Sequence, residues 1–331
     1  MPRKWTEDEI LDIAKGYQKA VLLFAAADLD IFTALSKKPM TAEALSAELD
    51  TDYRAASILL DALVALELLT KQNAKYSVTP TAADLLCQTK PQSVLPMVRH
   101  QANCLRRWVQ LPQITKSGKP AEPSPSICGE AADNAAFIGA MENFSRPVVA
   151  QIVEKLQPLS FRHLLDIGAA SGTWTIAFLN AHPKASATLF DLPDVIPMAK
   201  KRIDQAQLSD RVKFVPGDFY SDDLPPGADF VWLSAIAHQN SRSQNRELFA
   251  KICRALKPQG TLVIRDIVME NSRTQPPTGA LFAVNMLVAT QGGGTYTFEE
   301  YRADLLDAGF NDITLIARDE FMDSLIHAKK P

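Results

Sequence analysis

The second half of the chain alternates short apolar segments with amphipathic ones, and this alternation limits its fold more than any other feature. Segments with the apolar content of strands lie at residues 163–168, 186–191, 212–218, 229–235, 261–269 and 312–317. Helical patterns lie between most of them, as in RSQNRELFAKICRAL, which ends at KPQG. Strands that alternate with helices form a mostly parallel, doubly wound α/β sheet. Ligands of such sheets bind at the carboxyl ends of the strands.

The first ninety residues have a different pattern, which is almost entirely helical. Apolar residues recur at helical spacing in AVLLFAAADLDIFTAL, and Thr41 opens TAEALSAELD with the signature of a helix N-cap. A further helix is expected over YRAASILLDALVALELL, and the small hairpin TKQNAKYSVTP follows it. Helix, turn, helix and hairpin predict an all-helical winged-helix domain, with the hairpin as its wing, over residues 1–90.

A linker region separates these two parts of the chain. We expect one helix over residues 91–115 and another over AAFIGAMENFSRPVVAQIVEKL. Between them, SGKPAEPSPSICGE (117–130) has the proline, serine and glycine content of a hinge. We therefore divide the chain into residues 1–90, the linker helices 91–150 and a ligand-binding domain over 151–331. Sequence does not decide whether the hinge closes over a ligand.

Composition excludes several classes of function. The formal charge of −3 argues against broad nucleic-acid binding. The four cysteines form no close pairs, so neither a metal site nor a disulfide framework is indicated; they are Cys87, Cys104, Cys128 and Cys253. No apolar run has the length of a membrane span, and MPRKWTEDEI lacks the apolar core of a signal peptide. We expect a cytoplasmic protein with neither nucleic acid nor membrane as a partner.

The stretch HLLDIGAASGTW reads as a strand, a turn of small residues and the start of a helix. A dinucleotide-binding turn needs G-x-G-x-x-G, but Ala170 and Thr173 stand at its second and third glycine positions. The stretch instead matches D-x-G-x-x-x-G and resembles the first motif of class I S-adenosylmethionine-dependent methyltransferases. Small residues let the methionine part of that ligand pack against backbone, with its carboxylate near a helix N-terminus. The turn residues assigned to the cofactor are Asp166, Gly168, Ala169, Ser171 and Gly172.

The next two strand candidates also end in groups that suit a nucleoside. Asp191, followed by Leu192, is placed to accept hydrogen bonds from two ribose hydroxyl groups. Asp218 and Phe219 could bracket an adenine ring. Structural alternatives stay open: the glycines could serve only a tight turn, Asp191 could cap the following helix, and Asp218 could be a turn aspartate.

Nearly the whole chain resembles a family of small-molecule O-methyltransferases, which includes plant caffeic-acid-type enzymes, bacterial polyketide and carotenoid O-methyltransferases and acetylserotonin methyltransferase. The resemblance lies in LLDIGAASGTW, ATLFDLPDVI, VKFVPGDFY, ADFVWLSAIAHQNS, LKPQGTLVIRDIV and LVATQGGGTYTFEEYRADLLDAGF. It implies S-adenosyl-L-methionine as the cofactor, a small-molecule methyl acceptor, and a homodimer formed through the N-terminal winged-helix domain.

The same resemblance assigns the catalytic residues. His238 falls on the family's catalytic base, and Asp266 on one of two acids that orient it. The second acid is replaced by Thr295, and Ser234 stands where a lysine or another polar residue of the cofactor site is common. A phenol with a pKa of about 10 is poorly ionised at neutral pH, whereas a histidine with a pKa of about 6.5 can take its proton. The alternatives are that His238 only packs at a helix start and that Asp266 forms a salt bridge with an arginine.

The resemblance also implies an acceptor pocket lined by the linker helix, the helix before the first strand and the segment before GGG. The matching residues are Trp108, Phe137, Met141, Phe144, Phe282, Asn285 and Met286. Together they suggest an apolar, planar acceptor, with Asn285 as an orienting hydrogen-bond group. Aromatic residues and methionines at helical spacing are also ordinary core residues.

Two other functions remain open. Without the second acid, the accepting atom could be sulfur or carbon rather than oxygen, or the cofactor site could serve a reaction that transfers no methyl group. A transcriptional regulator would need a basic recognition helix. The candidate helix TDYRAASILLDALVALELL has one arginine against two aspartates and a glutamate, which favours burial in a dimer interface.

Overall fold

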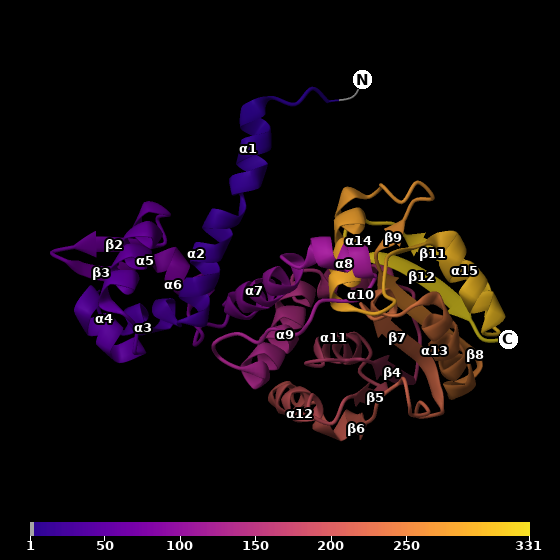
Figure 1. Ribbon diagram of the computed structural model, residues 1–331. Helices are drawn as coiled ribbons and strands as arrows, with labels where there is room; N and C mark the ends of the chain where they lie inside the picture. The colour runs from indigo at the N-terminus through magenta and orange to yellow at the C-terminus, as the bar shows by residue number, and fades with distance from the viewer. Residues whose placement is uncertain (1–2) are drawn as a thin grey trace. The chain divides into compact units, whose positions relative to one another are not determined.

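The computed structural model (Figure 1) describes residues 3–331. These residues form two compact units. The first unit contains the described residues up to Arg106 together with Ser124–Asn143, and the second contains Arg107–Pro123 and Phe144–Pro331. Residues 91–150, expected as linker helices, thus contribute to both units.

The first unit is mostly helical, with a small antiparallel sheet in the order β1-β3-β2. Its elements are α1 (Glu7–Lys15), α2 (Tyr17–Asp28), α3 (Ile31–Lys37), β1 (Met40–Thr41), α4 (Ala42–Leu49), α5 (Tyr53–Ala65), β2 (Leu69–Gln72), β3 (Lys75–Val78), α6 (Pro80–Leu86), most of α7 (Leu95–Trp108) and most of α9 (Glu130–Ser145). As expected, the Thr41 hydroxyl caps α4 by accepting a hydrogen bond from the N–H of Ala44. The hairpin β2–β3 also confirms the expected one. The core centres on Phe32, Leu45 and Leu60.

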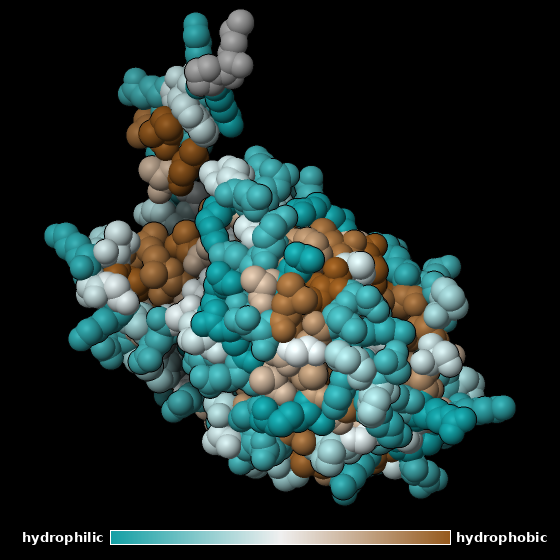
Figure 2. Space-filling view, turned by 90° about the vertical axis from the view of Figure 1, so that its right-hand side faces the viewer, coloured by the Kyte–Doolittle hydropathy of each residue, from teal (hydrophilic) through white to brown (hydrophobic). Residues whose placement is uncertain are grey.

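Helix α1 is amphipathic but buries none of its residues. Ile10 is 50% exposed and Ile13 is 64% exposed. In Figure 2 this helix carries brown, apolar side chains among teal ones. Contiguous exposed apolar side chains are typical of protein–protein contact surfaces.

Prolines break two of the expected helices. The helix expected over residues 91–115 is two helices, α7 and α8 (Leu111–Ser117), and the one expected over residues 135–156 is α9 and α10 (Val149–Lys155). Pro112 lies in the first turn of α8, and Pro147 lies between α9 and α10. Proline has no N–H to donate to the carbonyl group four residues earlier, so α7 and α9 do not continue through Pro112 and Pro147.

The second unit confirms the doubly wound sheet, with strands in the order β11-β12-β8-β7-β4-β5-β6. The strands are β4 (His163–Ile167), β5 (Ser186–Asp191), β6 (Val212–Pro216), β7 (Ala228–Ser234), β8 (Leu256–Asp266), β11 (Asn311–Ala317) and β12 (Ser324–Lys329); β9 (Val268–Met269) pairs separately with β10 (Tyr296–Thr297). The five adjacent strands β8, β7, β4, β5 and β6 are parallel to one another, whereas β12 is antiparallel to both of its neighbours, β8 and β11. Strand β12 was not expected, because SLIHAK has neither a clean alternation nor a continuous apolar run.

Helices cover both faces of the sheet (Figure 1), and the buried side chains of its inner strands fall into two separate apolar clusters. Leu165 and Leu233 pack with α13 (Arg242–Ala255) and α15 (Phe298–Asp307). Leu164 and Trp232 pack with α10, α11 (Thr173–Ala181) and α12 (Ile196–Gln205). Helix α14 (Pro277–Ala289) and the short 3-10 turns Ser209–Arg211 and Ala237–Gln239 complete the unit. Because both faces are covered, the inner strands are continuous apolar runs, and polar groups gather at their ends.

No helix among residues 3–331 is long and apolar enough to cross a membrane.

Candidate active site

The turn after β4 has a backbone conformation that favours small residues. Gly168, Ala170 and Gly172 have φ angles of +66°, +48° and +77°. A Cβ atom added to Gly168 would lie 2.5 Å from the Cδ1 atom of Ile236. Gly172 is the N-cap of α11. The turn therefore offers backbone and a helix N-terminus at the carboxyl end of β4.

Asp191, at the end of β5, is hydrogen-bonded to this turn. Its Oδ2 atom accepts a hydrogen bond from the N–H of Ala170 at 2.7 Å, and its Oδ1 atom accepts one from the N–H of Leu192 at 2.7 Å. The N-cap of α12 is Val195, so Asp191 does not cap that helix. Burial raises the pKa of Asp191, and the two N–H donors oppose that rise. The structure thus holds a carboxyl group beside the glycine turn.

Other predicted cofactor residues of the turn are buried. Asp166 is 1% exposed and accepts a hydrogen bond from the Thr175 hydroxyl at 2.6 Å; its burial raises its pKa to about 7. The Ser171 hydroxyl accepts a hydrogen bond from Arg202 of α12 at 2.7 Å, and Ala169 is buried as well. These contacts join β4, α11 and α12, and the assignment of the three residues to the cofactor stays a prediction.

The loop after β6 is held by its own turn and by α13. Asp218 accepts a hydrogen bond from the N–H of Tyr220 at 2.9 Å, as a turn aspartate does. Lys251 of α13 donates to the carbonyl oxygens of Phe219, Tyr220 and Asp222 at 2.9, 3.2 and 2.8 Å. The backbone that carries Asp218 and Phe219 is therefore fixed.

These segments share one edge of the sheet. Strands β7, β4, β5 and β6 are neighbours and run parallel, so their carboxyl ends are adjacent. The residues that end or follow them are Ser234, the Gly168 turn, Asp191 and Asp218. The fold thus brings together the strand ends that the sequence singled out.

His238 lies just beyond β7 and forms a pair with Asp266 at the end of β8. The two side chains are buried, and His238 Nδ1 lies 2.9 Å from Asp266 Oδ1. The N–H groups of His238 and Ile267 also donate to this carboxylate, at 3.2 and 2.8 Å. The Phe282 ring packs edge-on against the imidazole, with 4.8 Å between centroids. In the part of the chain that the structure describes, Asp266 is the only carboxylate that is hydrogen-bonded to His238.

The neighbouring arginine does not pair with Asp266. Arg265 is completely buried, donates from Nε to Asp323 Oδ1 at 2.7 Å and from Nη1 to the Ser234 hydroxyl at 3.1 Å. Its guanidinium carbon lies 5.1 Å from the ring centroid of Phe144 and 4.8 Å from that of Trp174. Burial lowers the pKa of Arg265, and the Asp323 carboxylate opposes that effect. These contacts of Arg265 could not be predicted, because nothing in VIRDIV separates the roles of Arg265 and Asp266.

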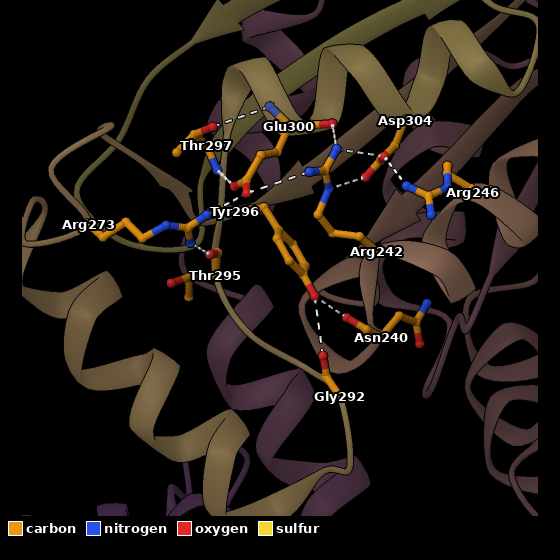
Figure 3. A network of polar contacts seen from close by, with 10 residues as sticks. All are labelled: Asn240, Arg242, Arg246, Arg273, Gly292, Thr295, Tyr296, Thr297, Glu300 and Asp304. Atoms are coloured by element: carbon orange, nitrogen blue, oxygen red, sulfur yellow. Dashed lines mark hydrogen bonds and ion pairs between the residues drawn. The ribbon is translucent and has the colours of Figure 1, made fainter. Parts of the chain in front are cut away.

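Thr295 occupies the position at which the resemblance implies a second acid. It is buried, and its carbonyl oxygen accepts a hydrogen bond from Arg273 at 3.0 Å. Figure 3 shows the acids that follow it, Glu300 and Asp304, paired with arginines. Arg273 pairs with Glu300, and Arg242 lies 2.8 Å from Asp304. Within residues 3–331, the ion pairs of Glu300 and Asp304 are with arginines, whereas that of His238 is with Asp266.

Most of the predicted acceptor residues lie in the second unit. The Trp108 indole N–H donates to Asn285 Oδ1 at 2.9 Å. Phe144 and Phe282 pack against a buried apolar cluster of Ile267, Met269 and Met322. Met286 is buried in α14; Phe137 and Met141 lie on α9 in the first unit, and their role stays a prediction. The sequence did not single out Met322 of this cluster, because DEFMDS has no periodic pattern.

Comparison with known proteins places this geometry in a family. The model of an O-methyltransferase domain matches residues 126–311, and that of an O-methyltransferase dimerisation domain matches residues 11–88. A 3-hydroxy-5-methyl-1-naphthoate 3-O-methyltransferase of Streptomyces sahachiroi is 31% identical over 93% of this chain and 90% of its own length. A tetracenomycin polyketide synthesis 8-O-methyl transferase of Streptomyces glaucescens is 31% identical over 98% and 96%. The solved structure of PigF with SAH has a TM-score of 0.86 at 24% identity, covering 98% of this chain and 100% of that one.

Proposed function

The chain belongs to the O-methyltransferase family and is a methyltransferase, and we propose that His238 is the general base for a hydroxyl group of an aromatic small molecule. The observation that carries this proposal is the buried pair of His238 and Asp266, 2.9 Å apart, at the ligand-binding edge of the sheet. This paired geometry favours the catalytic role over simple packing at a helix start.

The pair determines which nitrogen of the imidazole accepts a proton. A carboxylate only accepts hydrogen bonds, so Asp266 holds the proton on Nδ1 of the neutral ring and leaves the lone pair on Nε2. Methyl transfer is an in-line displacement, so the protein must deprotonate the nucleophile and align it. The contact with Phe282 holds the ring in place from another side.

The strand edge fits S-adenosyl-L-methionine, the methyl donor. That cofactor supplies a methyl carbon activated by a positively charged sulfur. The small residues Gly168 and Gly172 leave the backbone of the turn without long side chains, and we assign the methionine part of the cofactor to this backbone. The oxygens of Asp191 keep lone pairs for ribose hydroxyl groups, and we assign Asp218 and Phe219 to the adenine.

The acceptor side is apolar with one oriented amide. Phe144, Phe282 and Met322 belong to the apolar cluster next to His238. Trp108 occupies the Oδ1 atom of Asn285, so the amide presents its N–H donors to a ligand. This arrangement supports a planar aromatic acceptor that carries a carbonyl or hydroxyl oxygen, such as the hydroxynaphthoate named for the similar Streptomyces enzyme.

We also propose that the first unit, as a winged helix, joins two copies of the chain. The dimerisation model matches residues 11–88, and α1 exposes Ile10 and Ile13. The small sheet β1-β3-β2 beside α4 and α5 supports the winged-helix arrangement.

The test combines binding and turnover. Calorimetry with S-adenosylhomocysteine and mass spectrometry of 3-hydroxy-5-methyl-1-naphthoate and N-acetylserotonin compare the wild type with His238→Ala. We expect the variant to bind S-adenosylhomocysteine normally and to lose methyl transfer by about 10²-fold or more. Wild-type turnover by the variant would show that His238 is not the base.

A second candidate, transfer to an atom other than oxygen, has one specific support. An N,N-dimethyltransferase of Streptomyces rimosus is 29% identical over 97% of this chain. Mass spectrometry of amine and hydroxyl forms of the same aromatic acceptor distinguishes the two.

A further inference from the structure

A chain of hydrogen bonds joins the loop after β6 to the segment that carries His238. The Tyr220 hydroxyl lies 2.6 Å from Asn240 Oδ1, Asn240 Nδ2 lies 3.0 Å from Asn245 Oδ1, and Asn245 Nδ2 lies 2.9 Å from the carbonyl oxygen of Ala237. Ala237 immediately precedes His238. Both asparagines are buried, with exposed fractions of 0% and 1%.

The chemistry of these groups fixes the direction of every bond in the chain. The Ala237 carbonyl only accepts, so Asn245 must donate with its amide nitrogen and accept with its amide oxygen. The same reasoning then orients Asn240, whose oxygen must accept from Tyr220. The tyrosine is therefore the obligatory donor at the end of the chain, and burial together with the charge of Asp218 raises its pKa, which keeps it protonated.

The segment around His238 is also hydrogen-bonded to residues 294–296. The Tyr296 hydroxyl donates to the carbonyl oxygen of Asn240 (Figure 3), and the N–H of Gly294 donates to the carbonyl oxygen of His238 at 2.9 Å. Helix α13 carries both Asn245 and Lys251, the residue that holds the loop after β6. The loop assigned to the adenine and the segment that carries His238 are thus both hydrogen-bonded to α13. The Tyr220 hydroxyl also links the two segments directly, because it donates to Asn240.

We propose that Tyr220 is a positioning residue for methyl transfer: through Asn240 and Asn245, it couples the loop that carries Asp218 and Phe219 to the backbone of His238. Binding of the cofactor at that loop then orders the segment of the base. This inference rests on the proposed placement of the cofactor at Asp218 and Phe219. Tyr220 acts through other groups and takes no part in the chemistry.

The test uses the full-length protein, S-adenosylhomocysteine as the probe and the variant Tyr220→Phe, which removes only the hydroxyl. Hydrogen–deuterium exchange is followed in peptides covering residues 214–222 and 236–245. In the wild type, the probe slows exchange in both peptides. In the variant, the slowing of exchange in 236–245 by the probe is about fivefold smaller than in the wild type, which is the effect of one hydrogen bond. The slowing in 214–222 persists, and the Kd for S-adenosylhomocysteine stays within about twofold of the wild-type value. Tyr53→Phe, an exposed tyrosine of α5, is the matched control, and Asn245→Ala is expected to lose the same protection in 236–245.

The outcomes separate the two proposals. If the probe slows exchange in 236–245 equally in the wild type and in Tyr220→Phe, or in neither, the coupling is wrong. If the probe binds without slowing exchange in 214–222, the placement of the cofactor itself is wrong. A variant that weakens binding and protection everywhere to the same degree has lost structure only, and that result also overturns the coupling.

Discussion

The buried carboxyl group of Asp166 makes the stability of the second unit depend on pH. Its pKa is raised from the ordinary 3.8 to about 7, mainly because the group is buried, and the charge of Asp191 adds to the rise. The folded protein therefore binds more protons than the unfolded chain between these two values, so stability falls as pH rises through this range. Asp166→Asn keeps an oxygen that can accept the hydrogen bond from Thr175 and removes the charge.

The magnitude follows from the difference in pKa. One pKa unit corresponds to about 1.4 kcal/mol, so the charged carboxylate costs about 4 kcal/mol of folding free energy well above pH 7. At about pH 5.5 the cost is about 2 kcal/mol, because the group is then protonated in the folded protein and charged in the unfolded chain. We expect Asp166→Asn to stabilise the protein by about 2 kcal/mol more at about pH 8.5 than at about pH 5.5.

Urea denaturation of the protein without ligand measures this difference. The ring centroids of Trp174 and Trp232 lie 4.9 Å apart in the core of the second unit, so the fluorescence of these two tryptophans reports the unfolding of that unit. Asp223→Asn is the matched control, because that side chain is 89% exposed and a surface ion pair contributes little. A stabilisation by Asp166→Asn that is equal at the two pH values would refute the reasoning.

Further predictions concern the base, the turn and the dimer. Asp266→Asn is expected to lower kcat by about 10²-fold or more, because an amide can donate to Nδ1 of His238 and shift the proton to Nε2; an unchanged kcat with an aromatic hydroxyl acceptor would contradict the proposed tautomer. Gly168→Ala is expected to weaken S-adenosylhomocysteine binding by about tenfold or more in calorimetry, because its Cβ would collide with Ile236 and its φ is positive; an unchanged Kd would show that the cofactor does not depend on this turn. Ile13→Asp is expected to shift the protein from dimer to monomer in light scattering; a variant that stays dimeric would place the interface away from α1.

The local patterns of the sequence were sufficient to predict the doubly wound sheet and the strand ends that lie together at one edge of it. One apolar run is followed by Gly168, and another ends in Asp191. Parallel neighbouring strands have their carboxyl ends at the same edge of the sheet, so the pattern alone predicts that these two residues lie at that edge. The same patterns did not reveal β12, whose pairing with β8 and β11 depends on partners far away in the chain.

Pairing between side chains was decided only by the tertiary structure. The sequence VIRDIV left open whether Asp266 would pair with an arginine or with His238. Successive strand residues point to opposite faces of the sheet, so Arg265 pairs with Asp323 on one side and Asp266 with His238 on the other. Likewise, the chain of hydrogen bonds from Tyr220 to Ala237 joins the loop after β6, the segment of His238 and α13. No local sequence pattern indicates it. Periodicity encodes which face of an element is buried, whereas the partner of a buried polar group depends on how distant elements are brought together.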